Sequence, residues 1–203
     1  VLYIAGNHEH YAERIGRLHE KLRDAAAGSN IRILENDTFE LGGYRFFGAT
    51  LWTDFSLFDD RQSAMTAAGA KGTGMNDYRK IRRHDTSNRQ HKHTAMLHAD
   101  SRLALTQFLT SGDRARSIVI THHAPSIRSL PDDRYEDPIS AAYASNLEGL
   151  IAADGPALWV HGHIHSQRDY VIGQTRVVNN AFGYFDCCEI EHRGFRSDLV
   201  LKI

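Results

Sequence analysis

Three short apolar segments of this chain each stop abruptly at a polar loop that carries histidine. The loops cover residues 6–9 (Gly-Asn-His-Glu), 121–125 (Thr-His-His-Ala-Pro) and 162–165 (Gly-His-Ile-His). The segments before them are four or five residues long, which is the length of a buried strand rather than a helix. In open α/β sheets, sites gather just beyond the carboxyl ends of strands. We therefore expect the three loops to converge on one point.

The rest of the chain mixes helical and strand periodicity. Helices are expected from Tyr11 to Leu22 with a stop at 28–30, over 97–109 with Leu105, Phe108 and Leu109 on one face, and over 139–153. Strands are expected at 1–5, 31–34, 38–41, 44–49, 117–121, 157–160, 168–172, 175–178 and 199–203. The glycines at 42–43 predict a hairpin turn. This pattern indicates a mixed α and β fold.

Length and composition indicate one soluble domain over residues 1–203. Hydrophobic residues make up 41% and charged residues 24% of the chain, which are ordinary globular values. The formal net charge of −1 does not indicate nucleic acid as a partner, and no apolar run reaches the ~18 residues of a membrane helix. Periodicity is lost at about 52–95, which predicts a surface insertion. Oligomeric state is left open by the sequence.

The two cysteines, Cys187 and Cys188, are adjacent, which is neither a disulfide framework nor a spaced zinc site. Reduced thiols are the plain interpretation, and we expect a cytoplasmic protein. The chain opens at Val1 inside an apparent strand, so we take it to be a fragment or a processed product. The lack of a signal peptide is then uninformative.

The side chains in the three loops are suited to binding metal. Two imidazoles spaced as His-x-His can serve one metal or two adjacent ones, and imidazole suits zinc, iron, nickel and copper. The carbonyl oxygen of Asn7 is a neutral ligand, and Gly6 permits a tight turn. The alternative is structural: an Asn-His turn that only caps a helix, and a histidine pair on the surface.

These three loops resemble the motifs of the calcineurin-like metallophosphoesterases. That family's pattern reads Asp-x-His, Gly-Asp, Gly-Asn-His-Asp or -Glu, a histidine that ends a strand, and Gly-His-x-His. The last three occur here in order from Gly6 to His165, and residues 176–184 look like the tail that follows in bacterial members. The resemblance implies an α/β/β/α sandwich of two mixed sheets. No Asp-x-His or Gly-Asp precedes Gly6, so the first strand or strands are expected to be missing.

The resemblance also implies roles for individual residues. Asn7, His122 and His163 would bind one divalent metal and His165 its neighbour, with manganese, iron, zinc or nickel as candidates. His8 would be the general acid in hydrolysis of a phosphate mono- or diester, a small-molecule substrate. His123 would support the site from behind. The motifs absent upstream would supply most ligands of one metal, so we expect this chain alone to keep one metal weakly and the second hardly at all.

Several alternatives stay open. A metallo-β-lactamase would want Asp and His soon after the pair, whereas Ser166 and Gln167 follow His165; an amidohydrolase usually places its pair after the first strand. A non-catalytic metal-binding or scaffold protein of the same fold is the other alternative. Specificity is open too, with candidate phosphate-clamping residues at Lys80, Arg82, Arg83, His84, His91, His93, Arg128 and Arg134.

Overall fold

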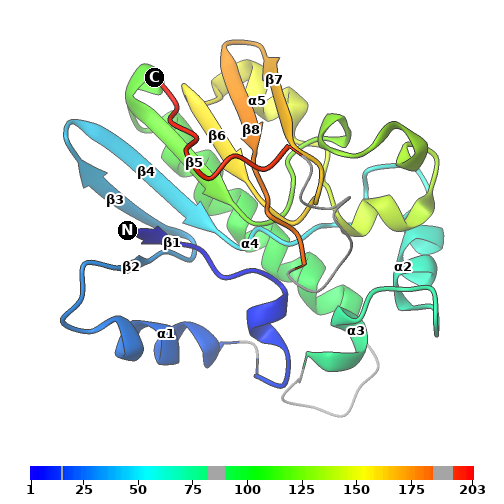
Figure 1. Ribbon diagram of the computed structural model, residues 1–203. Coiled ribbons are helices and arrows are strands. Elements are labelled where there is room, and N and C mark those ends of the chain that lie inside the picture. The colour runs from blue at the N-terminus through cyan, green and yellow to red at the C-terminus, as the bar shows by residue number, and fades with distance from the viewer. Residues whose placement is uncertain (15, 82–89, 185–193) are drawn as a thin grey trace.

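A computed structural model of the protein describes residues 1–14, 16–81, 90–184 and 194–203 (Figure 1). The strands are β1 (Leu2–Tyr3), β2 (Arg32–Ile33), β3 (Asp37–Leu41), β4 (Tyr44–Ala49), β5 (Ser117–Thr121), β6 (Leu158–His161), β7 (Arg168–Ile172) and β8 (Thr175–Asn179). The α-helices are α1 (Leu18–Ala26), α2 (Arg61–Gly69), α3 (Asp77–Lys80), α4 (Gln90–Thr110) and α5 (Glu148–Asp154). Short 3₁₀ helices lie at His8–His10, Arg114–Arg116, Ile127–Ser129, Asp132–Arg134 and Pro138–Ala142.

The larger sheet has six strands in the order β3-β4-β5-β6-β8-β7. Strands β4, β5, β6 and β8 run parallel, and β3 and β7 are antiparallel partners at the two edges. The register aligns the last residues of the parallel strands, which are Ala49, Thr121, His161 and Asn179. Because these strands end level with one another, the loops that follow them share one edge of the sheet.

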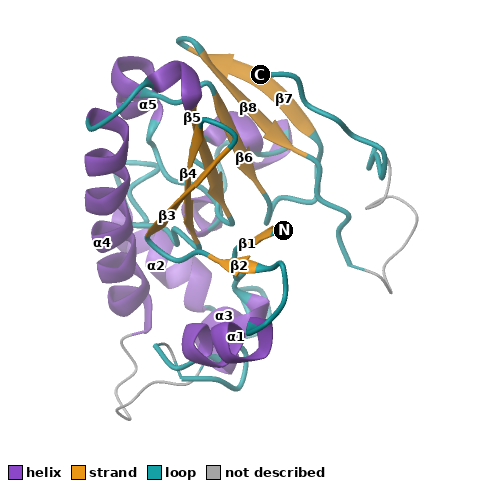
Figure 2. Cartoon of the chain, turned by 90° about the vertical axis from the view of Figure 1, so that its left-hand side faces the viewer, coloured by secondary structure: helices purple, strands orange, loops and turns teal. Residues whose placement is uncertain are grey.

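One face of this sheet packs against α4 and α5 (Figure 2). The core between them includes Phe47 and Val119 from the strands, and Leu105 and Ile151 from the helices, each at most 1% exposed. Burying a side chain of this size contributes about 1.5–3 kcal/mol. The predicted inward face of the helix over 97–109 is confirmed by these contacts.

The opposite face of the sheet packs against a second sheet, formed by parallel strands β1 and β2. The two sheets lie close together at Gly48 of β4, where a methyl group would overlap Ile4 and Leu34. Glycine is required there because it alone leaves room for the neighbouring side chains. Helix α1 packs in turn against β2. The layers therefore run helix, sheet, sheet, helix.

Residues 52–81, which fall in the stretch expected to be an insertion, contain α2 and α3. The carboxylate of Asp60 caps α2 by accepting the N–H of Ser63 at 2.9 Å. This segment shares an apolar cluster with α4 and the 3₁₀ helix at Pro138–Ala142, whose buried members are Phe55, Ala64, Ala68, Met75, Ala95, Ala141 and Ala142. The segment therefore packs against α4 and the 3₁₀ helix through buried apolar side chains. That it is an insertion stays a prediction.

The helix expected from Tyr11 to Leu22 begins later than predicted, at Leu18. The reason lies in a distant part of the chain. Tyr11 forms an antiparallel bridge with Ile81, and the N–H of Ala12 donates to the carbonyl oxygen of Lys80 at 2.9 Å. The backbone groups of Tyr11 and Ala12 are therefore paired with residues 80–81 and are not part of a helix.

Two further expectations are corrected. Residues 139–153 form a 3₁₀ helix and then α5, because Ala144 and Ser145 pair with the backbone of Ala124 between them. Residues 199–203 form no strand; Leu199 and Leu201 instead pack on the sheet face beside Val178 and its neighbours. Among the described residues, no helix has both the length and the apolar character needed to span a bilayer.

Candidate functional site

Three loops meet at the edge where the parallel strands of the larger sheet end. Asn7 and His8 follow β1, His122 follows β5, and His163 and His165 follow β6. All five side chains line one cleft of about 910 Å³. The structure thus brings these five side chains together in one cleft.

Atoms of three of these side chains converge. His122 Nε2 lies 2.8 Å from Asn7 Oδ1 and 3.1 Å from His163 Nδ1. Two atoms that bind one metal at about 2.1 Å, at right angles to each other, lie about 3.0 Å apart. The observed spacings therefore fit three ligands of one divalent ion. A set of two imidazoles and an amide oxygen suits several such ions.

The charge state of the two imidazoles also fits metal binding. Burial first, and then the neighbouring His123, lower the pKa of both His122 and His163 well below the usual value. Both rings are therefore neutral near pH 7, and each keeps a lone pair on one nitrogen. If His122 Nε2 carried a proton instead, that one proton would have to be shared between two acceptors, Asn7 Oδ1 and His163 Nδ1. Both hydrogen bonds would then be poorly aligned.

The cluster is unusual because one of its three members is an asparagine. Within the described ranges, no group of three or more His, Cys, Asp or Glu side chains is placed to hold a metal. Any ion at this position would therefore depend on the carbonyl oxygen of Asn7. That oxygen comes from a side chain only 5% exposed.

The backbone around His163 is strained. His163 has a φ of 65°, and the N–H of Ile164 donates across it to the Gly162 carbonyl oxygen at 2.7 Å. A non-glycine residue in this conformation costs on the order of 1–3 kcal/mol. His163 Nε2 is also buried without a hydrogen-bond partner in the described part of the chain. Backbone strain and unpaired buried polar atoms of this kind are concentrated at functional sites, where the surrounding structure holds the residue in place.

Gly6 sets the position of the first loop. Its N–H donates to Glu9 Oε2 at 2.8 Å, which closes the turn that carries Asn7 and His8. A methyl group on Gly6 would lie 2.7 Å from His122 Cε1 and 2.9 Å from Glu9 Oε2. Glycine is therefore needed for the close approach of this turn to His122.

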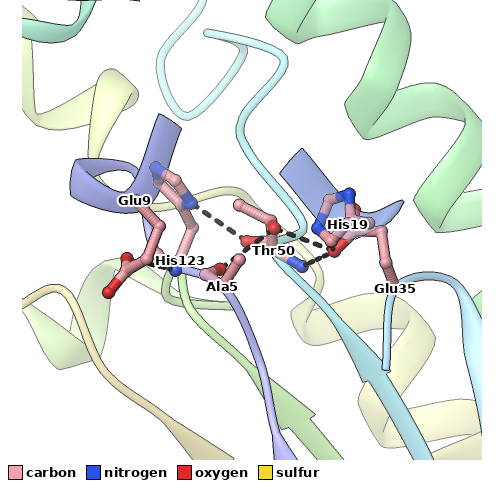
Figure 3. Close-up of polar contacts among 7 residues, drawn as sticks. Ala5, Glu9, His19, Glu35, Thr50 and His123 are labelled. Carbon is pink, nitrogen blue, oxygen red and sulfur yellow. Dashed lines mark hydrogen bonds and ion pairs between the residues drawn. The ribbon is translucent and has the colours of Figure 1, made fainter. Parts of the chain in front are cut away.

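A buried polar network supports the loops from behind (Figure 3). Thr50 follows β4; its N–H donates to Glu35 at 2.7 Å, and its hydroxyl lies 3.0 Å from the Ala5 carbonyl oxygen. The Thr50 carbonyl oxygen lies 3.0 Å from His123 Nδ1. Glu35 also lies 3.4 Å from His19 Nε2. This network joins the ends of β1, β4 and β5.

His123 is packed directly behind the converging atoms. Its ring centroid lies 4.4 Å from that of His163 and 5.2 Å from that of Trp52. Burial lowers the pKa of His123 to about 4, and burial has the same effect on His10 nearby. Both rings are neutral in the folded protein near pH 7. The supporting role expected of His123 suits this position and stays a prediction.

His8 lies at the exposed rim of the cleft. Its ring centroid is 4.6 Å from that of Tyr11 and 5.4 Å from that of Tyr184, and its Nε2 lies 3.3 Å from the Tyr184 hydroxyl. The edge of His165 faces the same Tyr184 ring at 4.7 Å. His8 therefore reaches the cleft with one nitrogen hydrogen-bonded, as a proton donor to a bound substrate would need.

The loop that carries His165 is held by the end of β8. The side-chain amide of Asn179 donates to the carbonyl oxygens of Ile164 and Ser166, the second at 2.9 Å. These two residues flank His165 on either side. The position of His165 is therefore tied to the parallel strand beside β6.

Sequence reasoning missed two members of the site, Asp77 and Tyr143. Asp77 is 1% exposed, and both of its oxygens accept hydrogen bonds from Asn7 Nδ2. Burial is the largest influence on the pKa of Asp77 and raises it, while hydrogen bonds from Tyr11 and Asn7 act in the opposite direction. The Tyr143 ring lies 5.0 Å from that of His163. Asp77 lies outside every motif and periodic segment. Tyr143 lies in the helix predicted over 139–153 but in no motif, so no sequence signal marked it for the site.

The candidate clamping residues are placed unevenly. Arg134 lines the cleft and pairs with Asp137 at 2.9 Å. Arg128 donates to the Val171 carbonyl oxygen and lies over the Tyr170 ring. Lys80 lies over the ring of Tyr11, His91 stacks on Tyr78, and His93 is half-buried on α4. Arg82, Arg83, His84, Cys187 and Cys188 lie outside the described residues.

Comparison with known proteins shows which fold the chain has. No family model matches the chain. The sequence is 23% identical over 204 residues to uncharacterized protein L509 of Acanthamoeba polyphaga mimivirus, covering 91% of this chain and 68% of that protein. The crystal structure of phosphopantetheinyl hydrolase (PptH) from Mycobacterium tuberculosis superposes with a TM-score of 0.66 and 13% identity. The alignment covers 91% of this chain and 69% of that one.

The chain has a metallophosphoesterase-type fold. The predicted fold class, α/β with mixed sheets between layers of helices, is confirmed by the sheet order and by this superposition. At 13% identity the likeness concerns the fold alone. Function has to be argued from the side chains in the cleft.

Proposed function

We propose that this protein is a metal-dependent hydrolase of phosphate mono- or diesters that uses a dinuclear centre. The observation that carries the proposal is the approach of His122 Nε2 to Asn7 Oδ1 at 2.8 Å and to His163 Nδ1 at 3.1 Å. These atoms would hold one divalent ion, which is manganese, iron, zinc or nickel. His165 would hold the second ion. Phosphoester chemistry is supported by the fold shared with a phosphopantetheinyl hydrolase.

Divalent ions in such a site lower the pKa of a bound water and polarise the phosphoryl oxygens of the substrate. The chain's own side chains add two things. Asn7, His122 and His163 are neutral ligands, so the positive charge of the site is left available to an anionic phosphate. His8 stands at the rim and would donate a proton to the departing alkoxide, with Tyr184 fixing its Nε2.

The proposal is tested by hydrolysis of bis-p-nitrophenyl phosphate with each candidate metal added. Both this chain and a form extended upstream should be assayed, because the family pattern places further ligands there. We expect turnover in the extended form and little or none in the 203-residue chain. Metal binding without turnover in both forms would favour the non-catalytic alternative.

The role of His8 is tested by His8→Ala in the active form. General acid catalysis is typically worth 10²–10⁴-fold, so kcat should fall by that order while the bound metal is retained. His161→Gln is the control, because His161 is a histidine near the site that does not line the cleft; its Nε2 lies 2.8 Å from Ser129 Oγ. Loss of metal from His8→Ala with unchanged residual activity would contradict the assigned role.

A further inference from the structure

Asp77 is a buried carboxylate that the proposed chemistry does not use. It begins α3, 70 positions along the chain from Asn7, and is 1% exposed. Its two oxygens lie 2.8 and 2.9 Å from Asn7 Nδ2. A carboxylate this deeply buried costs free energy unless hydrogen bonds compensate it. Here both oxygens accept a hydrogen bond from the same group, the side-chain amide of Asn7.

We propose that Asp77 is a positioning residue that fixes the orientation of the Asn7 side-chain amide. Through this contact, the segment around α3 becomes part of the site formed by the three loops. The consequence for metal binding rests on the proposed function. The orientation of the amide does not, and it can be measured on the metal-free protein.

The two ends of the Asn7 amide differ in their hydrogen bonding. The Asn7 amide has a donor end, Nδ2, and an acceptor end, Oδ1, whereas an ionised carboxylate only accepts. Asp77 therefore selects the donor end. Oδ1 is then directed to the other side, where it lies 2.8 Å from His122 Nε2. The opposite orientation would place Oδ1 against two carboxylate oxygens and turn the NH₂ group toward the histidines, where it could not bind a cation.

Asp77 is itself held in place. The Tyr11 hydroxyl donates to Asp77 Oδ1 at 2.6 Å. The backbone on both sides is paired as well, by the bridge between Tyr11 and Ile81 and by the hydrogen bond from Ala12 N to the Lys80 carbonyl oxygen. The carboxylate therefore cannot follow the amide if Asn7 rotates. A rigid partner of this kind is what orients a metal ligand.

The first test compares metal affinities in the form extended upstream, by calorimetric titration with Mn²⁺ and Zn²⁺. Replacing a residue that orients a ligand typically weakens metal binding 10–100-fold. We expect that loss in Asp77→Asn, which keeps the size of the side chain but replaces one of the two acceptor oxygens that face Asn7 Nδ2 with an NH₂ donor. Asp60→Asn is the control, because it makes the same change in an exposed carboxylate of the same segment, which accepts the N–H of Ser63 and does not contact Asn7. Its affinity should stay within about threefold of wild type.

A double variant separates orientation from general damage. In the combination of Asn7→Asp with Asp77→Asn, the new amide at 77 can donate to the new carboxylate at 7, whose second oxygen faces His122. The pair should bind metal more tightly than Asp77→Asn alone, although two substitutions would normally weaken binding further. Equal affinity in wild type and Asp77→Asn would overturn the inference while leaving the proposed function intact.

The second test needs no metal. In wild type, the Asn7 side-chain NH₂, whose NMR signals are assigned by their loss in Asn7→Ala, should contain a proton that exchanges slowly with solvent because it faces the buried Asp77 carboxylate. Exchange should accelerate at least tenfold in Asp77→Asn and stay slow in Asp60→Asn. Fast exchange in wild type would refute the inference whatever the metal result. Slow exchange in a protein that binds no metal would leave the orientation intact and refute the proposed function.

Discussion

Substitution of Gly6 by alanine should weaken metal binding by displacing His122. The new methyl group would lie 2.7 Å from His122 Cε1 and 2.9 Å from Nδ1 of the same ring. Ordinary contact begins at 3.4 Å, so the ring must retreat by about 0.7 Å. Functional constellations tolerate displacements of about 0.5 Å, and a shift near 1 Å can cost 10²-fold. We expect metal affinity to fall 10–100-fold.

The stability of the Gly6→Ala protein should change much less than its metal affinity. Overpacking of this kind costs about 1–3 kcal/mol, and Gly6 is not among the residues with positive φ, so its backbone accepts alanine. Calorimetric metal titration and urea unfolding measure the two effects separately. Gly149→Ala is the control, because nothing lies within 4 Å of the added methyl group. If Gly6→Ala bound metal as tightly as Gly149→Ala, the position of the His122 ring would not determine affinity, and the reasoning would fail.

Three further predictions concern stability. The pKa values of His10 and His123 are about 4 in the folded protein, against about 6.5 in the unfolded chain. The free energy of unfolding should therefore be highest above pH 6.5 and fall toward pH 4, by on the order of 3 kcal/mol per histidine. Urea unfolding at pH 7.5, 5.5 and 4.5 measures this, and a flat profile would contradict it. Phe47→Ala should lower the free energy of unfolding by about 3–5 kcal/mol, whereas Leu103→Ala, at a site 62% exposed, should change it by less than about 0.5 kcal/mol; similar losses in both would argue against the core described. Thr50→Val should cost about 1–3 kcal/mol because the Glu35 and Ala5 partners lose the hydroxyl, and a neutral result would show that the network is not stabilising.

The larger sheet and the approach of the three loops were accessible from sequence because they depend on local pattern. The compact apolar run at 117–121 could only be a buried strand, and the polar residues that begin at His122 had to follow its carboxyl end. The strands and turn of the hairpin at 37–49 were equally local. The two-sheet arrangement, by contrast, came from resemblance to a family and was then confirmed by the structure.

What the sequence could not provide depends on contacts between distant residues. Asp77 lies in a segment with no periodicity, and its importance appears only when Asn7 is placed beside it. The late start of α1 has the same cause, since Tyr11 pairs with Ile81 across the chain. Local propensity does not anticipate such pairings. The assignment of roles to individual metal ligands stays a prediction.

The central claim is that Asn7, His122 and His163 bind a divalent ion beside a second ion held through His165. Elemental analysis of the purified protein, in this form and in one extended upstream, tests that claim most directly. The account predicts close to two metal ions per chain in the extended form, and loss of metal in His122→Ala but not in His161→Gln. An extended protein that is free of metal after purification, and stays so after incubation with manganese, iron, zinc and nickel, would contradict it.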